Sequence, residues 1–411
     1  MNKKIYSELR EELTKNILPY WEQYSKDPKS NGFYGAIDNS NKGNAKAWRS
    51  IVMVSRYLWS YSQAARLLKD ESYLDMADYA YAYMMKDFRD PYYGGVYWSV
   101  KQDGREELER KQIYGEAFAC YALSEYACVV KELRKSQLCA ENIMSECLSI
   151  YNLLEKYALD KELGGYAEAL NRDWSFTKET SLSAKDIDCA KSMNTNLHVM
   201  EAYTNLYRNL PVVYPENKNL LKAVGKSLSS LVKVHLEKIL NKKDFHLDLY
   251  FNDKWQQIGP DEISYGHDIE ASWLLWEAAE VLQNESLMKK VKAPALKIAE
   301  ISYNEGFDQE TGAFDNTMLN GKRDTTRVWW NQAEAINGFY NAWQLTGDEK
   351  YSRAVERIWE WVKTYQKDKS CGEWFASVTR EGKPVAKELK GGNWKTSYHN
   401  GRCCMELLKR K

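Results

Sequence analysis

The chain has 411 residues, and because Lys plus Arg and Asp plus Glu each number 58, its formal net charge is zero. This balance argues against broad electrostatic attraction to nucleic acid or to an anionic membrane. Hydrophobic residues make up 44% and charged residues 28%, an ordinary globular composition. The 15 Trp and 29 Tyr stand out. Aromatic rings suit the apolar faces of sugars, although more than half of such rings usually pack in the core.

The first segment, residues 1–21, is typical of an amphipathic helix and lacks the apolar centre of a signal peptide. No apolar run of about 18 residues predicts a transmembrane helix. The eight Cys include no C-x-x-C pair and none has a His at zinc-ligand spacing. We therefore expect a cytoplasmic protein with free thiols, without a membrane or nucleic-acid partner.

Helical apolar spacing recurs along the whole chain. It is clear over 5–24, 48–69, 72–88, 112–133, 137–157, 190–210, 217–240, 264–283, 286–303, 328–346, 349–366 and 400–409. These segments form six successive pairs. Between the two helices of each pair lies a Gly-rich or aromatic phrase with the alternation of a short strand. The six phrases are 31–35, 93–98, 164–167, 245–250, 312–315 and 371–375.

The phrases lie about 60–80 residues apart, and each interval holds two helices. Helix pairs repeated in this way bury each other's faces. Six pairs close most naturally into an all-α (α/α)6 barrel of twelve helices with short β-hairpins in the connecting loops. An open α-solenoid is the alternative, but its repeats are usually shorter, about 33–47 residues. No linker divides the sequence, so residues 1–411 are predicted to form a single barrel domain.

The second helix of each pair carries unusual polar or aromatic residues near its start. In a barrel these six helix starts would meet at one mouth and form a single small-molecule pocket. The residues are Arg56, Tyr114, Asn194, His198, His267, Glu270, Trp330, Glu334 and His399.

Two of the five histidines follow or precede a glycine at the start of a predicted helix. His267 follows Gly266 and is three residues before Glu270, which can hold its imidazole in one tautomer. His399 lies two residues before Gly401. Each is a candidate for acid–base chemistry, although a buried histidine that forms a stabilising ion pair would have the same pattern.

The other histidines are more ambiguous. His198 shares an apolar helix with Asn194 and Glu201, so it is equally compatible with a catalytic and a structural role. His235 is expected to be structural or exposed. His246, in the fourth loop phrase, is expected to pack or to form hydrogen bonds.

Trp330 and Glu334 are four residues apart, so one helix face presents a ring and a carboxylate that could stack on a sugar and accept its hydroxyls. Arg56 interrupts an apolar helix and needs a partner, either a core carboxylate or a substrate oxygen. The sequence has no phosphate-binding loop, dinucleotide fingerprint, G-x-S-x-G or H-E-x-x-H motif. The candidate histidines lack metal-type spacing, although a spatially assembled metal site stays possible.

Four phrases closely resemble the cellobiose 2-epimerases of the N-acylglucosamine 2-epimerase superfamily. They are Lys191–Tyr203, Ser264–Trp273, Thr326–Ala335 and Tyr398–Arg402. The resemblance extends from the first helix to Arg402, and Ser264–Glu270 favours the cellobiose branch over N-acylglucosamine epimerases and mannose isomerases.

The resemblance implies an (α/α)6 barrel that binds a disaccharide without a cofactor or metal. His267 and His399 match the acid–base pair, and His198 matches a third histidine that polarises the oxygen at C1. The remaining matches are expected to bind substrate: Arg56, Asn194 and Glu270 at the reacting end, Trp330 and Trp394 as aromatic walls, Tyr114 in the pocket and Asp186 at the second sugar. We add Glu334 and Trp374 to the substrate-binding candidates.

The implied reaction is inversion at C2 of the reducing-end sugar, through ring opening and an enediolate. Mannobiose 2-epimerase, aldose–ketose isomerase and N-acylglucosamine epimerase are alternatives within the superfamily. An inverting (α/α)6 glycoside hydrolase and a non-catalytic sugar-binding module are alternatives from other classes. We expect a monomer or a weak homo-oligomer.

Overall fold

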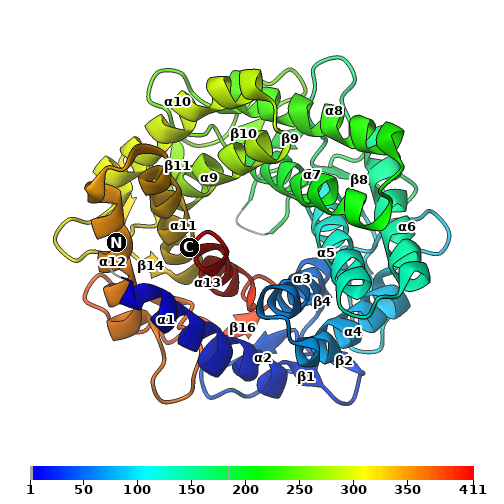
Figure 1. Ribbon diagram of the computed structural model, residues 1–411, viewed down its shortest axis with the longest axis horizontal. Helices are drawn as coiled ribbons and strands as arrows, with labels where there is room; N and C mark the ends of the chain where they lie inside the picture. The colour runs from blue at the N-terminus through cyan, green and yellow to red at the C-terminus, as the bar shows by residue number, and fades with distance from the viewer. Residues whose placement is uncertain (1–2, 184–185) are drawn as a thin grey trace.

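The computed structural model describes residues 3–183 and 186–411. Over these ranges it contains twelve helices in two concentric rings (Figure 1). The chain alternates between the rings, as the six helix pairs predict. The inner helices are α3 (Ile51–Leu68), α5 (Ile113–Glu132), α7 (Met193–Val213), α9 (Tyr265–Val281), α11 (Trp329–Thr346) and α13 (Tyr398–Lys409).

The outer helices share one feature: a π-helical segment follows or interrupts each of them. The α-helical parts are α1 (Lys4–Glu11) with α2 (Leu18–Tyr24), α4 (Leu74–Tyr83), α6 (Gln137–Leu153), α8 (Lys218–Val234), α10 (Glu285–Ile301) and α12 (Glu349–Trp361). The π-helical segments are Glu12–Ile17, Met84–Phe88, Leu154–Ala158, His235–Ile239, Ser302–Gly306 and Val362–Gln366.

The inner ring is closed. Each inner helix contacts the next one along the chain, and α13 returns to contact α3. Figure 1 shows α13, in dark red, on the inner side next to α3. The inner helices are buried around almost their whole circumference because outer helices cover them on one side and side chains fill the barrel on the other. The (α/α)6 barrel prediction is therefore confirmed.

Short antiparallel strands join successive repeats. The strand before each inner helix pairs with a strand from the following loop, and β16 pairs with β3 to close the circle. These pairings link neighbouring repeats. The hairpins that the sequence predicted within single loops also form, as the strand pairs β1–β2, β5–β6 and β12–β13 and as isolated bridges such as Arg89–Val96. The strands are β1 (Lys26–Asp27), β2 (Gly32–Phe33), β3 (Ala36–Ile37), β4 (Arg49–Ser50), β5 (Ser99–Val100), β6 (Glu106–Leu108), β7 (Lys111–Gln112), β8 (Ala169–Leu170), β9 (Lys191–Ser192), β10 (Tyr250–Phe251), β11 (Glu262–Ser264), β12 (Thr317–Leu319), β13 (Lys322–Asp324), β14 (Arg327–Val328), β15 (Ser377–Val378) and β16 (Gly391–Gly392).

A recurring ion pair fixes where the inner helices begin. In five repeats an aspartate in the loop after the outer helix pairs with a basic residue shortly before the inner helix: Asp27–Arg49, Asp90–Lys111, Asp160–Lys191, Asp308–Arg327 and Asp368–Lys390. The fourth repeat has Asn241 and Ile263 instead. There the ring of His246 bridges Asp268 on α9 and Glu305. The hydrogen-bonding role predicted for His246 is confirmed.

The described residues include no helix that is long and apolar enough to cross a membrane. His235, one of the two histidines expected to lack a catalytic role, is fully buried in the outer ring and its Nδ1 lies 2.8 Å from the carbonyl oxygen of Leu231.

Candidate active site

The starts of the inner helices meet around a cavity of about 300 Å³ at the centre of the barrel. It contains every residue that the sequence predicted for the reacting end of the sugar. The lining residues are Arg56, Tyr114, Leu182, Ser183, Asp186, Asn194, His198, His267, Glu270, Trp329, Trp330, Trp394 and His399.

A second cavity of about 230 Å³ adjoins the first. The two share Leu182, Asp186, Asn194, His267 and Trp330. The second is walled by the loop that carries Asp186 and by strands β10 to β12. Together the two cavities form one elongated space that begins at the histidines and leads towards the loops.

All three candidate histidines are held through Nδ1. His399 lies 2.7 Å from Oε1 of Glu334, and His198 lies 2.7 Å from Oε2 of Glu201. His267 lies 2.7 Å from the hydroxyl oxygen of Ser264. Since Nδ1 is occupied in each ring, Nε2 is the nitrogen available for proton transfer.

The partner of His267 corrects one prediction. Glu270 was expected to hold this imidazole, but its Oε1 instead accepts a hydrogen bond from Nη2 of Arg402 at 2.5 Å. Position 270 is one helical turn further into the barrel, where the guanidinium lies. Ser264, the last residue of β11, is near enough to take its place.

Glu334 and Trp374 also differ from their predicted roles. Glu334 is fully buried and contacts His399, Arg402 and Nε1 of Trp273, so it orients a histidine and is not a lining residue for sugar. Trp374 is fully buried against the outer ring, where its Nε1 donates to Glu12 and its ring lies beside that of Trp359 on α12. It is a core residue and does not line the central cavity.

The aromatic and cationic walls agree better with expectation. The Trp330 ring lies 4.8 Å from the His267 ring and 5.6 Å from the His399 ring, centroid to centroid. Arg56 donates to the carbonyl oxygen of Trp394 and, at 3.1 Å, to the hydroxyl of Tyr114. Among the described residues Arg56 has no carboxylate partner, so its charge is available to an oxygen of a bound molecule.

Comparison with known proteins places this geometry in a family. The family model described as N-acylglucosamine 2-epimerase matches residues 32–403. The chain belongs to the N-acylglucosamine 2-epimerase family. A cellobiose 2-epimerase from Bacteroides fragilis is 37% identical over 409 residues, which cover 99% of this chain and 100% of that protein.

Two further relatives agree with this placement in the 2-epimerase family. A cellobiose 2-epimerase from Dictyoglomus turgidum is 36% identical over 99% of both chains. The solved structure of cellobiose 2-epimerase from Bacillus thermoamylovorans B4167 superimposes with a TM-score of 0.90 at 37% identity and covers 100% of both chains.

In this family member, burial keeps the two candidate acid–base histidines neutral. Loss of solvation is the largest cause and lowers the pKa of both His267 and His399 to about 3. Burial also lowers the pKa of His198. Imidazoles with such low pKa values are free bases at neutral pH, as proton abstraction requires.

Arg402 on α13 connects the carboxylates behind the histidines. Its guanidinium donates to Glu201, Glu270 and Glu334. Burial opposes ionisation of Glu201, but Arg402 and His198 hold the pKa of its carboxyl at about 2. The partners of His198 and His399 are thus tied to one buried cation, which fixes both rings from behind.

Sequence reasoning gave no role to Ser264 or Arg402, and noted Glu201 only as part of a polar stripe. Two signals were present: Glu201 is three residues after His198, and Arg402 interrupts an apolar helix in the same way as Arg56.

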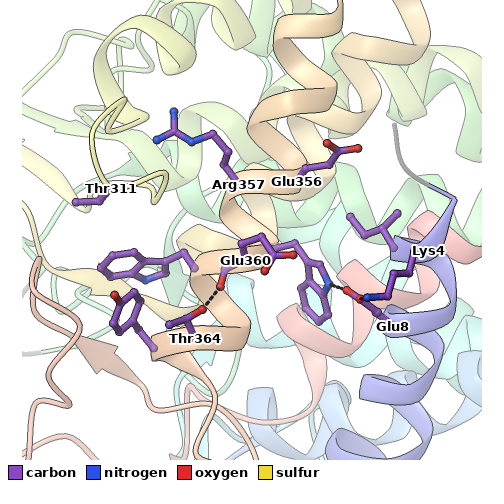
Figure 2. A pocket seen from close by; sticks show the side chains of 11 residues that line it. Lys4, Glu8, Thr311, Glu356, Arg357, Glu360 and Thr364 are labelled. Atoms are coloured by element: carbon purple, nitrogen blue, oxygen red, sulfur yellow. Dashed lines mark hydrogen bonds and ion pairs between the residues drawn. The ribbon is translucent and has the colours of Figure 1, made fainter.

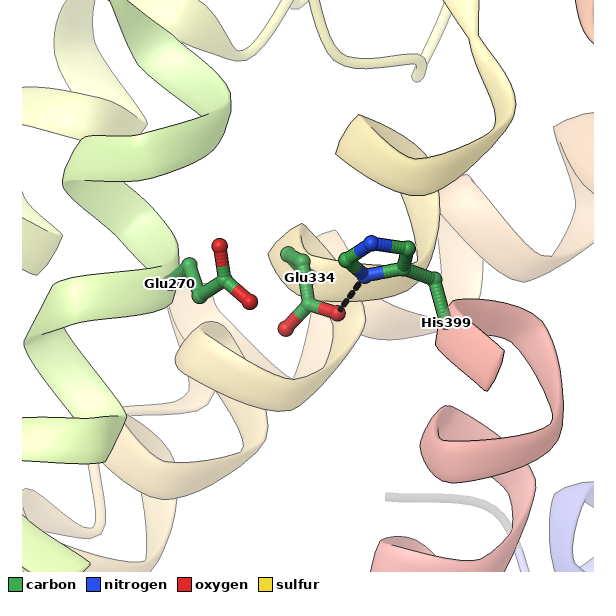
Figure 3. Close-up of side chains that lie close together, drawn as sticks. All are labelled: Glu270, Glu334 and His399. Atoms are coloured by element: carbon green, nitrogen blue, oxygen red, sulfur yellow. Dashed lines mark hydrogen bonds and ion pairs between the residues drawn. The ribbon is translucent and has the colours of Figure 1, made fainter. Parts of the chain in front are cut away.

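Figure 3 shows Glu270, Glu334 and His399 pointing towards one another from α9, α11 and α13. One ligand atom from each lies within 4.8 Å of the others, a spacing that could hold a metal ion. However, Nη2 of Arg402 donates to both carboxylates. A guanidinium in this position supplies the positive charge that a metal would otherwise bring.

A separate cavity of about 520 Å³ lies outside the barrel, between α1 and α12 (Figure 2). Two of its charged groups already have partners: Glu8 accepts from Trp359 and Lys363, and Arg357 donates to the backbone carbonyls of Gln309 and Glu310. It contains no histidine, so proton transfer at neutral pH is better supported in the central cavity.

Proposed function

We propose that this protein is a cellobiose 2-epimerase, which inverts C2 at the reducing end of β-1,4-linked disaccharides such as cellobiose and lactose. The observation that carries the proposal is the set of three buried imidazoles around one cavity, each held at Nδ1 and each with a lowered pKa. The relatives named above are cellobiose 2-epimerases, and this chain matches them over almost their whole length, which supports the choice of substrate.

The chemistry begins with the open-chain aldehyde, whose carbonyl acidifies the proton at C2. His267 or His399 removes that proton and the other returns one to the opposite face, since both line the same cavity. Negative charge develops on the C1 oxygen. Arg56, Asn194 and His198 line the cavity and are the groups that would stabilise it, Asn194 through the N–H donors of its side-chain amide.

The second sugar occupies the adjoining cavity in this proposal. Inversion requires access to both faces of C2, so the reacting sugar lies between the histidines and its C4 substituent extends towards Asp186. Trp330 and Asp186 line both cavities and are placed to contact both sugars. Trp394 and Tyr114 line only the inner cavity.

A glycoside hydrolase on the same fold is less well supported. Inversion by hydrolysis needs two carboxyl groups about 6.5–9.5 Å apart with water between them. The ligand oxygens of Glu270 and Glu334 are within 4.8 Å of each other, and both accept from one nitrogen of Arg402. Asp186 would have to pair with one of them instead.

The test is product analysis in D₂O. Wild-type protein is incubated with cellobiose, lactose, mannobiose and mannose, and products are identified by NMR. We expect a glucosyl-mannose from cellobiose with deuterium at C2 and an intact glycosidic bond. His267→Asn and His399→Asn should each lose at least about two orders of magnitude in turnover while staying folded. Free glucose from cellobiose would favour the hydrolase, and ketose as the main product the isomerase.

We further propose that residues 1–411 act as one catalytic domain in the cytoplasm, as a monomer or weak homo-oligomer. The closed inner ring supports one folding unit. The eight cysteines are all free thiols, six of them on inner helices or in α6, which suits a reducing compartment. Light scattering would test the oligomeric state.

A further inference from the structure

Glu270 lies beside the cavity of the reacting sugar, and one of its carboxyl oxygens has no hydrogen-bond partner among the described residues. Its side chain is fully buried and lines that cavity. Oε1 accepts from Nη2 of Arg402, but Oε2 is buried and has no hydrogen-bond partner among the described residues. An ionised carboxylate oxygen left in this state would be costly, whereas a protonated one needs only an acceptor.

The neighbouring carboxylate takes the negative charge. Glu334 accepts from Nη2 of Arg402 and Nε1 of Trp273 and contacts Nδ1 of His399. These partners lower the pKa of Glu334, although burial opposes ionisation. Burial, and then the charge of Glu334, raise the pKa of Glu270 well above its usual value. Two carboxyl groups share one guanidinium nitrogen, and the one with fewer donors keeps the proton.

The number of protons that the two histidines must exchange requires a further proton donor. Inversion by two bases needs one neutral histidine to take the C2 proton and one protonated histidine to return a proton. Burial leaves both His267 and His399 neutral at rest. The acid must therefore gain its proton before C2 reacts.

We propose that Glu270 is the general acid that opens the sugar ring. This inference rests on the proposed epimerase function and deepens it. Oε2 of Glu270 gives its proton to the ring oxygen O5 as the C1–O5 bond breaks and its electron pair passes to O5. One of the paired histidines takes the proton from the O1 hydroxyl, and the O1 electrons form the C1 carbonyl. That histidine is now protonated, and Glu270 is ionised beside Arg402.

The remaining steps restore every group. The neutral histidine removes the C2 proton, and the electrons pass through C1 to O1. The protonated histidine then gives its proton to the other face of C2, and the carbonyl reforms. On ring closure the O5 hydroxyl attacks C1 and returns its proton to Glu270, while O1 takes the proton from the histidine that abstracted from C2. No external acid, base or oxidant is consumed.

The experiment separates ring opening from C2 chemistry with Glu270→Gln, which keeps the shape of a protonated glutamate but cannot give up a proton. Acceleration of α-cellobiose mutarotation, followed by NMR, should fall by roughly 10²–10⁴-fold in the variant. Exchange of the C2 hydrogen of D-glyceraldehyde in D₂O, which needs no ring opening, should stay within about threefold of wild type. Thermal stability should be unchanged or higher, because a neutral side chain replaces a neutral side chain.

Glu116→Gln is the matched control. Glu116 is also a fully buried glutamate on an inner helix, but it does not line the cavity, so both rates should stay at wild-type values. The proposal is overturned if Glu270→Gln still accelerates mutarotation, or if it loses both rates equally. Wild-type protein that accelerates mutarotation but exchanges C2 of no disaccharide would instead overturn the proposed function and leave this role of Glu270 standing.

Discussion

Nδ1 of His399 lies 2.7 Å from Oε1 of Glu334. Among the residues that the structure describes, the equivalent nitrogen of His267 contacts a hydroxyl alone, that of Ser264. The two histidines of the proposed acid–base pair are therefore not equivalent. A carboxylate stabilises the imidazolium that forms when a histidine accepts a proton, and a hydroxyl does so much less.

Replacing each Nδ1 partner measures this asymmetry. Glu334→Gln should lower kcat for cellobiose by roughly 10–100-fold with little change in KM, because the partner of His399 loses its charge. Ser264→Ala should cost only a few-fold. The measurement is steady-state kinetics on both variants, with thermal unfolding as the control for folding. Equal losses in the two variants would contradict the asymmetry.

Glu116 provides a second prediction, on stability. Its Oε1 accepts from the backbone N–H of Val96 at 2.9 Å, while Oε2 has no partner among the described residues. In the corresponding place in the fifth repeat, Gln332 accepts from the N–H of Phe314 and also donates to its carbonyl oxygen. Glu116 thus occupies a position where the fifth repeat has an amide side chain. Burial raises the pKa of Glu116 from 4.5 to about 7.

Glu116→Gln should stabilise the protein above pH 7, by on the order of 1–3 kcal/mol. In the folded state Glu116 keeps its proton up to about pH 7, whereas the unfolded chain ionises near pH 4.5. The stability that this proton contributes is therefore complete below pH 4.5 and is lost as pH rises through 7. Denaturant unfolding at pH 5 and pH 8 checks the result: the gain should be larger at pH 8. A variant less stable at both values would contradict it.

Much of the fold follows from patterns that repeat along the chain. The twelve apolar periodicities gave helix positions that agree closely with the structure; for example, 112–133 corresponds to α5 at Ile113–Glu132. The pairing of strands between repeats was missed, because two-residue strands carry little periodic signal. The recurring Asp–basic pair was also visible in the sequence, but its two members lie about 20 residues or more apart, beyond the reach of helical or strand spacing.

Contacts in the site were predictable where the two partners are close in sequence, and less so where they are far apart. Glu201 is one turn from His198, and the structure pairs them. Glu334 and His399 are 65 residues apart, so their contact depends on how α11 and α13 pack. Spacing alone paired Glu270 with His267. In the structure the buried guanidinium of Arg402, on the last helix, donates to that carboxyl group instead.

Removal of metals is the third prediction. Glu270, Glu334 and His399 have a spacing that suits a cation, but the guanidinium of Arg402 already donates to both carboxyl groups. Epimerisation should therefore survive EDTA treatment followed by dialysis, with kcat unchanged within error. The check is activity before and after chelation, together with metal analysis of the dialysed protein. Activity that is lost and then restored by a divalent ion would contradict the prediction.

The last prediction concerns Asp186, which lines both cavities. Its carboxylate accepts hydrogen bonds from the hydroxyls of Ser183 and, at 3.1 Å, Tyr250. These contacts hold the carboxylate at the boundary where the second sugar would begin. A hydrogen bond from a sugar hydroxyl to a charged acceptor contributes about 1.5–3 kcal/mol.

Asp186→Ala should therefore lower kcat/KM for cellobiose several-fold or more, mainly through KM, and leave any slow reaction on mannose nearly unchanged. Tyr250→Phe is the matched control, because it removes one of the loop contacts of Asp186 and keeps the carboxylate. If Asp186 binds the second sugar directly, Asp186→Ala should change the ratio of disaccharide to monosaccharide kcat/KM much more than Tyr250→Phe does. If the residue only fixes its loop, both variants should lower the two rates together, with a matching loss of thermal stability. An equal loss on both substrates in Asp186→Ala would rule out direct binding.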